Sequence, residues 1–348
     1  MMQEYTGRAC YISGTQQLSV EPLTVPVADD KVLVKMTRGG ICGSDIHYYY
    51  HGGVGDLPLQ HPMILGHEVA GRVVNAPAGS KLTPGQKIVI NPSLPCEKCR
   101  YCLEGHENHC SDMRFWGSAM RNPHIHGGFS DYLSVDIKRC IPYNPEIDDK
   151  VMVFAEPLAV AIHSVNLAGG LIGKHVLVSG AGPIGCLIIA VAKACGAESV
   201  TAFDISDKSC QLALSMGADI AINSSDAKNV AHFKANKGYF DVAFDASGVP
   251  AAIQLMIQIT RPTGTLIQVG NSRGFTEIPL MDIVAKELTL KGSFRFGKEF
   301  LSAVNWLENG RIDPLPLLSA EINIDNAEAA ILLAADKTQS AKVQLTFD

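Results

Sequence analysis

Between residues 174 and 292 the chain alternates short apolar runs with segments of helical pattern. The apolar run HVLVS leads into a glycine-rich turn, and a helical pattern follows it. The other apolar runs cover 199–206, 241–247, 264–270 and 287–294, and the segments 206–217 and 250–261 have helical patterns. Parallel strands need such helical crossovers. The pattern therefore predicts an α/β domain with a doubly wound parallel sheet at residues 157–292.

The rest of the chain has a different pattern. Its short β-rich runs, KVLVKMT, GRVVNA and QKIVINP, are separated by many glycines and prolines, which is typical of an irregular β-barrel. A helix is predicted around FLSAVNWLENG, and the final AKVQLTFD is predicted to return to the barrel as a strand. We therefore assign residues 1–156 and 293–348 to a second, β-rich domain.

Composition narrows the class of protein. The chain has 348 residues, 47% of them hydrophobic, and a net charge of −6 without a basic block, so nucleic acid is not expected as a partner. The beginning, MMQEYTGRACYISG, lacks a basic start followed by an apolar run, so no secretory signal is predicted. Glycines and a proline interrupt the most apolar stretch, 174–193, so no membrane span is expected. The expected location is cytoplasmic.

Four of the ten cysteines lie within 15 residues, in CEKCRYCLEGHENHC, at Cys96, Cys99, Cys102 and Cys110. In a reducing compartment, clustered thiols point to metal more than to disulfides. Four cysteines suit a closed, structural zinc site in a loop. An iron–sulfur cluster also takes four thiolates, and the spacing does not exclude it. A disulfide pair is the weaker alternative.

A second set of metal-ligand types is spread along the chain. Cys42 lies in GGICGSDIHYY, His67 and Glu68 lie in LGHEVAG, and Glu156 lies in FAEPLAVAIH. A catalytic zinc keeps three protein ligands and leaves one position for water or substrate. Asp45 is predicted to hold the ligating histidine in one tautomer.

The glycine-rich turn has a pattern that binds dinucleotides. Gly180, Gly182 and Gly185 form G-x-G-x-x-G between a predicted strand and a predicted helix. Asp204 ends the next apolar run and can accept from the ribose hydroxyls of NAD, which favours NAD over NADP. Lys208 could accommodate the 2′-phosphate of NADP, so NADP remains an alternative.

These motifs together resemble zinc-dependent medium-chain alcohol and polyol dehydrogenases over the whole chain. The signature G-H-E-x2-G, the four-cysteine spacing and the loop GAGPIG carry the resemblance, and CGSD-x-HYY with EPLAVA-x-H is typical of the polyol branch. Ethanol-type members usually have a cysteine where this chain has Glu156. The resemblance implies a GroES-like catalytic domain and a Rossmann cofactor domain.

The resemblance also implies an activity. The segments DMRFWGSAM, PHIHGGFSDY, LKGSFRF and IDPLPLLSAE are similar to those of sugar-acid dehydrogenases, although Asp313 stands where an asparagine is expected. The implied reaction is reversible oxidation of L-idonate at C5 to 5-keto-D-gluconate, with hydride transfer to NAD(P)⁺. Two zinc ions per chain and a homo-oligomer, a tetramer rather than a dimer, are further implications.

Individual roles follow from the matching positions. Catalytic roles fall to Ser44, His47 and Glu68. The catalytic zinc would be held by Cys42 and His67 with Glu68 and Glu156, of which one binds directly and the other through water. The cofactor would contact Gly180, Gly182, Pro183, Ile184, Gly185, Asp204, Lys208, Val269, Gly270 and Asn271. The substrate would contact Tyr48, Phe115, Glu156 and Arg295.

A sugar acid also needs a cation or donors for its carboxylate. Arg295 is the first candidate, because a planar guanidinium can bind a carboxylate through two hydrogen bonds. Arg114, Arg121, His124 and His126 are the alternatives, and a solvated surface charge is the favoured interpretation of Arg121.

Three other functions remain open at this point. The chain could be a sorbitol or threonine dehydrogenase of the same family, a zinc-free quinone reductase, or a non-catalytic NAD-binding protein. The cysteine cluster with Cys42 and His67 disfavours the second, and the intact cofactor loop disfavours the third.

Overall fold

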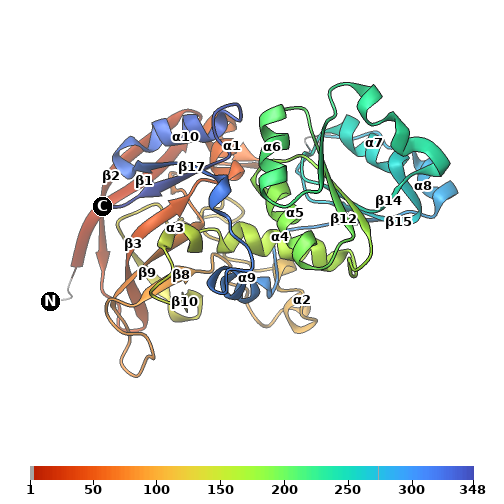
Figure 1. Cartoon of the computed structure of the whole chain (residues 1–348). Helices are drawn as coiled ribbons and strands as arrows, with labels where there is room; N and C mark the ends of the chain where they lie inside the picture. The colour runs from red at the N-terminus through yellow and green to blue at the C-terminus, as the bar shows by residue number, and fades with distance from the viewer. Residues whose placement is uncertain (1–3, 273) are drawn as a thin grey trace. The chain divides into compact units, whose positions relative to one another are not determined.

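The computed structural model describes residues 4–272 and 274–348, and the chain divides into two compact units (Figure 1). The first unit comprises residues up to Glu156 with Phe300–Gly310 and Leu318–Asp348. The second comprises Pro157–Glu299 with Arg311–Leu317. Residues 293–299 and 311–317 thus group with the second unit, although the sequence pattern assigned them to the β-rich domain.

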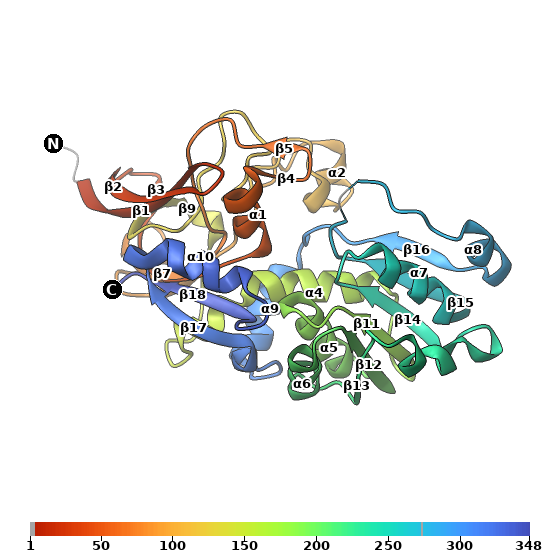
Figure 2. The same ribbon diagram turned by 90° about the horizontal axis from the view of Figure 1, so that it is seen from above.

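The second unit contains a six-stranded parallel sheet in the order β13-β12-β11-β14-β15-β16. Its strands are β11 His175–Ser179, β12 Ser199–Asp204, β13 Ile220–Asn223, β14 Phe240–Asp245, β15 Thr260–Gln268 and β16 Thr289–Gly292. This is the strand order 3-2-1-4-5-6 of the Rossmann fold, which confirms the predicted doubly wound sheet. In Figure 2, β16 and α8 lie at one edge of the sheet.

The helices of the second unit follow their sequence signals. They are α4 Ala155–Leu167, which begins in the first unit, α5 Pro183–Ala194, α6 Asp207–Ser215, α7 Pro250–Ile259 and α8 Leu280–Lys286. Pro183 and Pro250 occupy first-turn positions, where the absent N–H costs no hydrogen bond. The Ser206 side chain caps α6 by accepting from the backbone of Ser209.

The first unit is β-rich, as predicted. Its larger sheet has the order β10-β8-β7-β3-β18-β17 with β9 beside β3, and a smaller sheet has the order β2-β1-β6. The strands are β1 Glu4–Gly14, β2 Gln17–Pro26, β3 Lys31–Gly40, β4 Gly53–Val54, β5 Leu57–Pro58, β6 Met63–Ile64, β7 Glu68–Asn75, β8 Lys87–Ile90, β9 Tyr132–Asp136, β10 Cys140–Pro142, β17 Leu318–Asn323 and β18 Lys342–Thr346. The helices are α1 Gly43–His51, α2 Arg100–Leu103, α3 Asp149–Met152, α9 Glu299–Glu308 and α10 Ala327–Ala335.

The larger sheet brings together strands that lie far apart in the chain. Strand β3 pairs with β7 on one side and with β18, from the end of the chain, on the other. The predicted return of the last strand is therefore observed. This pairing places the beginning of β7, the segment after β3 and the beginning of β18 close together.

Candidate active site and metal centres

Three side chains of metal-ligand type meet at the ends of these strands. Cys42 is the N-cap residue of α1, His67 precedes β7, and Glu68 begins β7. One ligand atom from each lies within 4.8 Å of the others. Strand register explains the meeting, because Gly40 at the end of β3 pairs with Glu68 and Cys42 follows two residues later.

The chemistry of this group fits a zinc ion. A thiolate, an imidazole and a carboxylate are common protein ligands of a catalytic zinc, which keeps a fourth position open. His67 and Glu68 are buried, and within residues 4–272 and 274–348 His67 Nδ1 has no hydrogen-bond partner. Cys42 is partly buried, and holding three such polar groups together away from water is unfavourable unless a cation is shared among them.

Glu156, near the N-terminus of α4, lies beside this group but is not part of it. The side chain is buried, and burial raises the pKa of Glu156 to about 8. The charge of His67 opposes this shift, while Glu68 and Cys42 add to it. Without a metal ion, Glu156 therefore keeps its proton at neutral pH. A bound cation would reverse that preference.

Lys342 completes the group, and the sequence did not predict it. Its Nζ lies 2.6 Å from Oε1 and 2.5 Å from Oε2 of Glu68, and their side chains are only 4% and 1% exposed. Burial opposes the charge on Lys342, but Glu68 and Cys42 outweigh burial and raise its pKa. Burial raises the pKa of Glu68, and the charge of Lys342 opposes that shift. Because the two groups are in direct contact, we describe them as a buried ion pair. The sequence signal that could have revealed Lys342 is a lysine within the apolar strand AKVQLTFD.

Asp45 has a different role from the predicted one. Its carboxylate accepts hydrogen bonds from the backbone N–H of Cys42 at 2.9 Å and of Gly66 at 3.2 Å. Asp45 is fully buried. It thus fixes the backbone beside Cys42 and beside His67, rather than bonding to the imidazole Nδ1.

The remaining predicted catalytic and substrate residues of the first unit lie on α1 and in the segment after the cysteine cluster. Ser44 and His47 are half-buried and one turn apart on α1. The buried Tyr48 hydroxyl accepts from the backbone N–H of Ala119 at 2.8 Å. The ring of Phe115 lies 5.5 Å from that of His67, centroid to centroid. Phe115 therefore forms an apolar wall beside the ligand group.

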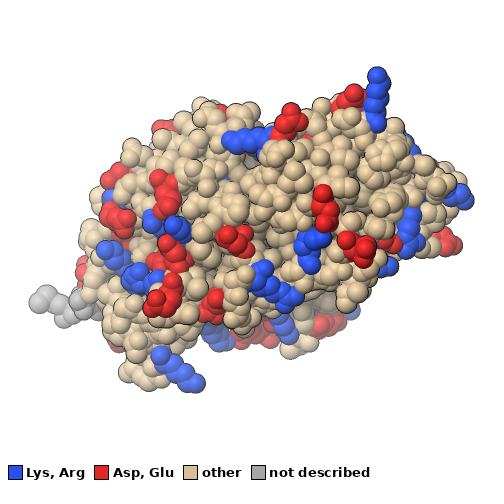
Figure 3. Space-filling view, viewed as in Figure 1, with Lys and Arg blue, Asp and Glu red and all other residues tan. Residues whose placement is uncertain are grey.

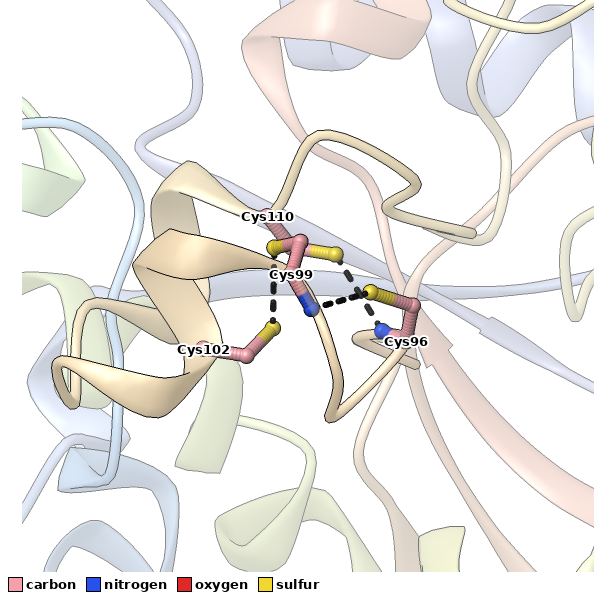
Figure 4. A group of neighbouring side chains, drawn as sticks. All are labelled: Cys96, Cys99, Cys102 and Cys110. Carbon is pink, nitrogen blue, oxygen red and sulfur yellow. Dashed lines mark hydrogen bonds between the residues drawn. The ribbon is translucent and has the colours of Figure 1, made fainter.

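The four clustered cysteines face one another around α2 (Figure 4). Their four sulfur atoms all lie within 4.8 Å of one another. Zinc–sulfur bonds of about 2.3 Å in a tetrahedron place the sulfurs about 3.8 Å apart. The spacing fits one metal ion, whereas an iron–sulfur cluster needs its thiolates farther apart. All ten cysteines are free, so no disulfide competes.

Backbone N–H groups point at these sulfur atoms. Cys96 Sγ accepts from Cys99 at 3.3 Å, and Cys110 Sγ accepts from Cys96 at 3.1 Å and from Asp112 at 3.3 Å. Backbone donors from Cys102 and Ser111 lower the pKa of Cys99 to about 5. Burial raises the pKa of Cys102 to about 12, with the neighbouring thiol of Cys99 adding to the shift. A metal ion would displace the remaining protons.

In the second unit, each of the three glycines of the turn after β11 is required for a different structural reason. Gly180 has φ +91°, and a Cβ there would lie 2.8 Å from the backbone nitrogen of Ser247. Gly182 has open space around it, which leaves room for a phosphate. A Cβ on Gly185 would collide with the carbonyl oxygen of Gly180. These are the roles of tight turn, phosphate approach and helix packing expected for the motif.

Asp204 ties this loop to the next helix. Its carboxylate accepts from the backbone N–H of Ala181 at 2.8 Å and of Ser206 at 3.0 Å. Each oxygen keeps a further lone pair for a ribose hydroxyl. Lys208 is exposed in the first turn of α6, and Pro183 and Ile184 begin α5 beside the glycine turn.

The buried Asp245, at the end of β14, organises the other side of the cofactor region and was not predicted. Its carboxylate accepts from Ser247 and Gly248, and from Gln268 Nε2. Its carbonyl oxygen accepts from the backbone N–H of Val269 and Gly270. The predicted contacts Val269 and Gly270 are thereby held at the end of β15, followed by the exposed Asn271.

Most alternative candidates for the substrate carboxylate are already engaged. His124 Nε2 accepts from the backbone of Gln60 at 2.8 Å, and its Nδ1 lies 2.8 Å from the carbonyl of Arg121. The Arg121 guanidinium donates to the Ser111 carbonyl at 2.7 Å and pairs with Asp112 at 2.9 Å. His124 and Arg121 therefore brace the segment that follows the cysteines.

Three candidates remain after His124 and Arg121. His126 Nδ1 accepts from the backbone of Ile64, and burial lowers the pKa of His126, which disfavours a positive charge there. Arg114 is exposed. Arg295, in the second unit, has φ +54° and its guanidinium lies 5.0 Å from the Phe294 ring centroid. A non-glycine residue in this region of φ stores strain, which is more common at functional positions.

Comparison with known proteins places both units in one family. Residues 28–145 match the model described as alcohol dehydrogenase GroES-like domain, and residues 183–309 match that of zinc-binding dehydrogenase. The chain is 49% identical to L-idonate 5-dehydrogenase (NAD(P)(+)) of Escherichia coli, over 98% of each chain. It is 33% identical to a probable D-xylulose reductase A of Aspergillus terreus, over 92% of each. The crystal structure of L-idonate 5-dehydrogenase from Escherichia coli superposes with a TM-score of 0.97 and 48% identity, over 99% of each chain.

Proposed function

Because the chain belongs to the zinc-dependent medium-chain alcohol dehydrogenase family and is an oxidoreductase, we propose that it is an L-idonate 5-dehydrogenase. The reaction is L-idonate plus NAD(P)⁺ giving 5-keto-D-gluconate, NAD(P)H and a proton, and it is reversible. The observation that carries this proposal is the 49% identity to the Escherichia coli enzyme over 98% of both chains.

The ligand group of the first unit supports the chemistry. A zinc ion held by Cys42, His67 and Glu68 would supply Lewis acidity, lowering the pKa of the C5 hydroxyl. Lys342 holds the Glu68 carboxylate in place through their buried ion pair. Phe115 limits water beside His67. Bound NAD(P)⁺ would supply the hydride acceptor for C5.

The proton takes a separate route. Ser44 and His47 stand one turn apart on α1 and are both partly exposed, which suits a relay from the substrate hydroxyl to solvent. Glu156 is a second carboxylate beside the ligand group. It is not one of the three grouped ligands, but it interacts electrostatically with them. On this proposal Glu68 would hold the metal ion directly and Glu156 would act through a water molecule.

Zinc and NAD(P) are the cofactors of this family, and we infer two zinc ions per chain. One is catalytic and the other is held by Cys96, Cys99, Cys102 and Cys110. Metal analysis of the purified enzyme tests the count directly, because a result of one zinc would contradict one of the two sites.

We expect NAD to be preferred over NADP, with the glycine turn, Pro183, Ile184, Val269, Gly270 and Asn271 as contacts. Asp204 offers free lone pairs beside the turn, and its negative charge disfavours a 2′-phosphate. Asp204→Ala should shift the ratio of kcat/KM for the two cofactors toward NADP⁺. In this variant the exposed Lys208 should bind the 2′-phosphate of NADP⁺. An unchanged ratio for the two cofactors would remove this role from Asp204.

Arg295 is our candidate for the substrate carboxylate, and Tyr48 and Phe115 for the remaining contacts. Arg295→Met should lower kcat/KM on L-idonate more than on uncharged L-iditol, by an interaction of about 2–5 kcal/mol. Arg121→Met is the matched control, since its guanidinium is engaged by Ser111 and Asp112. Equal losses on both substrates would make Arg295 a general binding or structural residue.

A substrate screen tests the function itself. NAD⁺ reduction measured on L-idonate, gluconate, sorbitol and threonine should give the highest kcat/KM on L-idonate. Preference for sorbitol would make the enzyme a polyol dehydrogenase, which the likeness to D-xylulose reductases keeps as the second candidate. Absence of any activity with zinc-loaded protein would leave a binding function.

We also infer a homo-oligomer, a tetramer rather than a dimer. All four residues of the edge strand β16 are exposed, and large apolar side chains nearby are exposed as well, namely Phe275, Leu280, Met281, Val284 and Phe294. An open edge with such a surface favours association with a second copy. Light scattering of the purified enzyme measures the state.

Nucleic acid and membrane partners are not expected, and the proposed location is cytoplasmic. Figure 3 shows basic and acidic side chains interspersed on the face in view. Among the described residues, the one helical stretch long and apolar enough to span a membrane is Asp149–Leu167, and 67% of it is buried inside the protein. That burial is what a core helix shows.

A further inference from the structure

A second feature of the first unit lies apart from the ligand group. A cavity of about 180 Å³ is lined by the basic side chains Lys31, Arg114 and Arg139, by Asp136 and Ser134, and by Trp116 with two aliphatic residues. None of the proposed zinc ligands lines it, and it lies within the first unit. It therefore needs its own explanation.

Arg139 is the most buried residue in the lining of this cavity. It is only 3% exposed, and its Nη2 donates to the backbone carbonyl of Arg114 at 2.6 Å. The guanidinium carbon lies 5.2 Å from the ring centroid of Trp116. Its Nε and Nη1 are buried and have no hydrogen-bond partner within the described ranges 4–272 and 274–348. A buried cation with two unused donors is costly.

The lining of the cavity does not neutralise this charge. Three cations face one carboxylate, Asp136, which already pairs with Lys31 at 3.2 Å. Within the described part of the chain, neither Arg114 nor Arg139 forms an ion pair. Burial lowers the pKa of Arg139 to about 10, so the group is still charged at neutral pH. Two positive charges thus remain without a partner.

We propose that this cavity binds a small oxyanion of the phosphate class. A doubly charged phosphate group matches the two unpaired charges. Its oxygens suit the fork of donors that arginine presents, and Ser134 adds a hydroxyl to the lining. The aromatic face of Trp116 holds the Arg139 guanidinium from one side. The site goes beyond the proposed dehydrogenase activity and does not depend on it.

The position of the cavity gives it a link to the ligand group. Arg114 and Trp116, which contribute to the cavity, flank Phe115 in the chain, and the ring of Phe115 lies beside His67. Hydrogen bonds from the backbone of Arg114 to Leu94 and from Trp116 to Pro92 keep this segment in place. An anion bound to Arg139 and Arg114 would therefore stabilise the segment that carries Phe115.

The test uses zinc-loaded enzyme saturated with NAD⁺, so that the cofactor's own phosphate site is filled. Inorganic phosphate is titrated at constant ionic strength, and binding is followed by calorimetry and by the rise in the thermal midpoint. Wild-type enzyme should bind one phosphate per chain saturably. Acetate, a singly charged probe, should bind more weakly, and equal binding of acetate would overturn the assignment to phosphate.

Variants locate the binding. Arg139→Met and Arg114→Met should each weaken phosphate binding about tenfold or more. Lys138→Met is the matched control, because this neighbouring lysine is exposed and pairs with Glu97 at 2.8 Å, and it should bind as the wild type does. If Arg139→Met does not fold, Arg114→Met decides the matter. No saturable binding by the wild type, or unchanged affinity in the arginine variants, would overturn the proposal.

Discussion

The two candidate zinc sites of the first unit use opposite strategies. The four cysteines lie within 15 residues of sequence on a surface loop, where neighbours such as Leu103 and Tyr101 are largely exposed. The active-site group instead draws Cys42, His67, Glu68 and Lys342 from distant parts of the chain into a largely buried position. One site is local and only partly buried, and the other is assembled by strand pairing.

This difference indicates what each metal ion does for the fold. The cysteine loop has almost no apolar core of its own, so the metal provides the stability that burial provides elsewhere. The active-site group sits on strands that other contacts already hold, and the metal there serves chemistry. We therefore expect the two sites to respond differently to the same kind of change.

The largest expected effect is on activity, from the assembled site. His67→Ala should lower kcat/KM about 10³-fold or more, because several kcal/mol of Lewis-acid stabilisation are lost. The zinc content should fall by about one per chain, with the fold retained. His106→Ala, an exposed histidine of the cysteine loop, is the control. Unchanged zinc content in His67→Ala would contradict the ligand set.

The next effect concerns the buried ion pair. In chelator-treated protein, Lys342→Met leaves the Glu68 carboxylate buried without a cation, which should lower the free energy of unfolding by about 3–5 kcal/mol. Lys342→Arg keeps the charge and should recover part of the loss. Urea unfolding at neutral pH measures both. A loss as small as that of a surface substitution would mean that the pair contributes nothing.

Breaking the local site should affect stability rather than chemistry. Cys99→Ser should remove one zinc ion per chain and lower the free energy of unfolding by about 3 kcal/mol. This is the stabilisation that a ligand gives when its free concentration is roughly a hundred times its Kd. The kcat of the folded fraction should change little. Cys195→Ser, at a cysteine outside both groups, should keep both zinc ions. Loss of catalysis with full stability in Cys99→Ser would reverse the roles of the two sites.

The last prediction concerns the pH dependence of the metal-free protein's stability. Glu156 holds its proton up to about pH 8 in the folded chain, whereas an unfolded glutamate loses it near pH 4.3. The native state therefore binds more protons in this window, and the free energy of unfolding falls as pH rises, by at most about 1.4 kcal/mol per pH unit.

Comparison with Glu156→Gln isolates this contribution. Chelator-treated Glu156→Gln should show a shallower fall between these pH values, and the exposed Glu146→Gln should behave as the wild type does. Zinc-loaded enzyme should lose the effect, because the cation favours the ionised carboxylate. Identical slopes for wild type and Glu156→Gln would refute the role of burial.

Much of the fold could be predicted where the pattern is strong. The parallel strands from β11 to β16 are mostly apolar runs with helical segments between them, so their type and order of appearance were predictable. Strand β13, Ile220–Asn223, was not predicted, because a short edge strand has no buried run. The hairpin of β1 and β2 was not predicted either. Most of its residues are partly or fully exposed, and polar and apolar residues are mixed along it.

The site was predictable to the extent that it is written in local motifs. The cysteine spacing and the glycine turn carry their chemistry within a few residues. Lys342 carries no such motif, because its role depends on the pairing of β18 with β3 and a partner 274 positions away. The interpretation of Asp45 was wrong for a related reason, since backbone donors at Cys42 and Gly66 reach its carboxylate first.

The late position of Lys342 has a consequence for how the enzyme is made. Glu68 leaves the ribosome long before its cation, and at 5–20 residues per second the 274 intervening residues take roughly 14–55 s. The four cysteines emerge almost together, and the second unit lies mostly within this interval. We therefore expect the cysteine loop to acquire its metal during translation. The catalytic group can mature only later, when β18 takes its place beside β3.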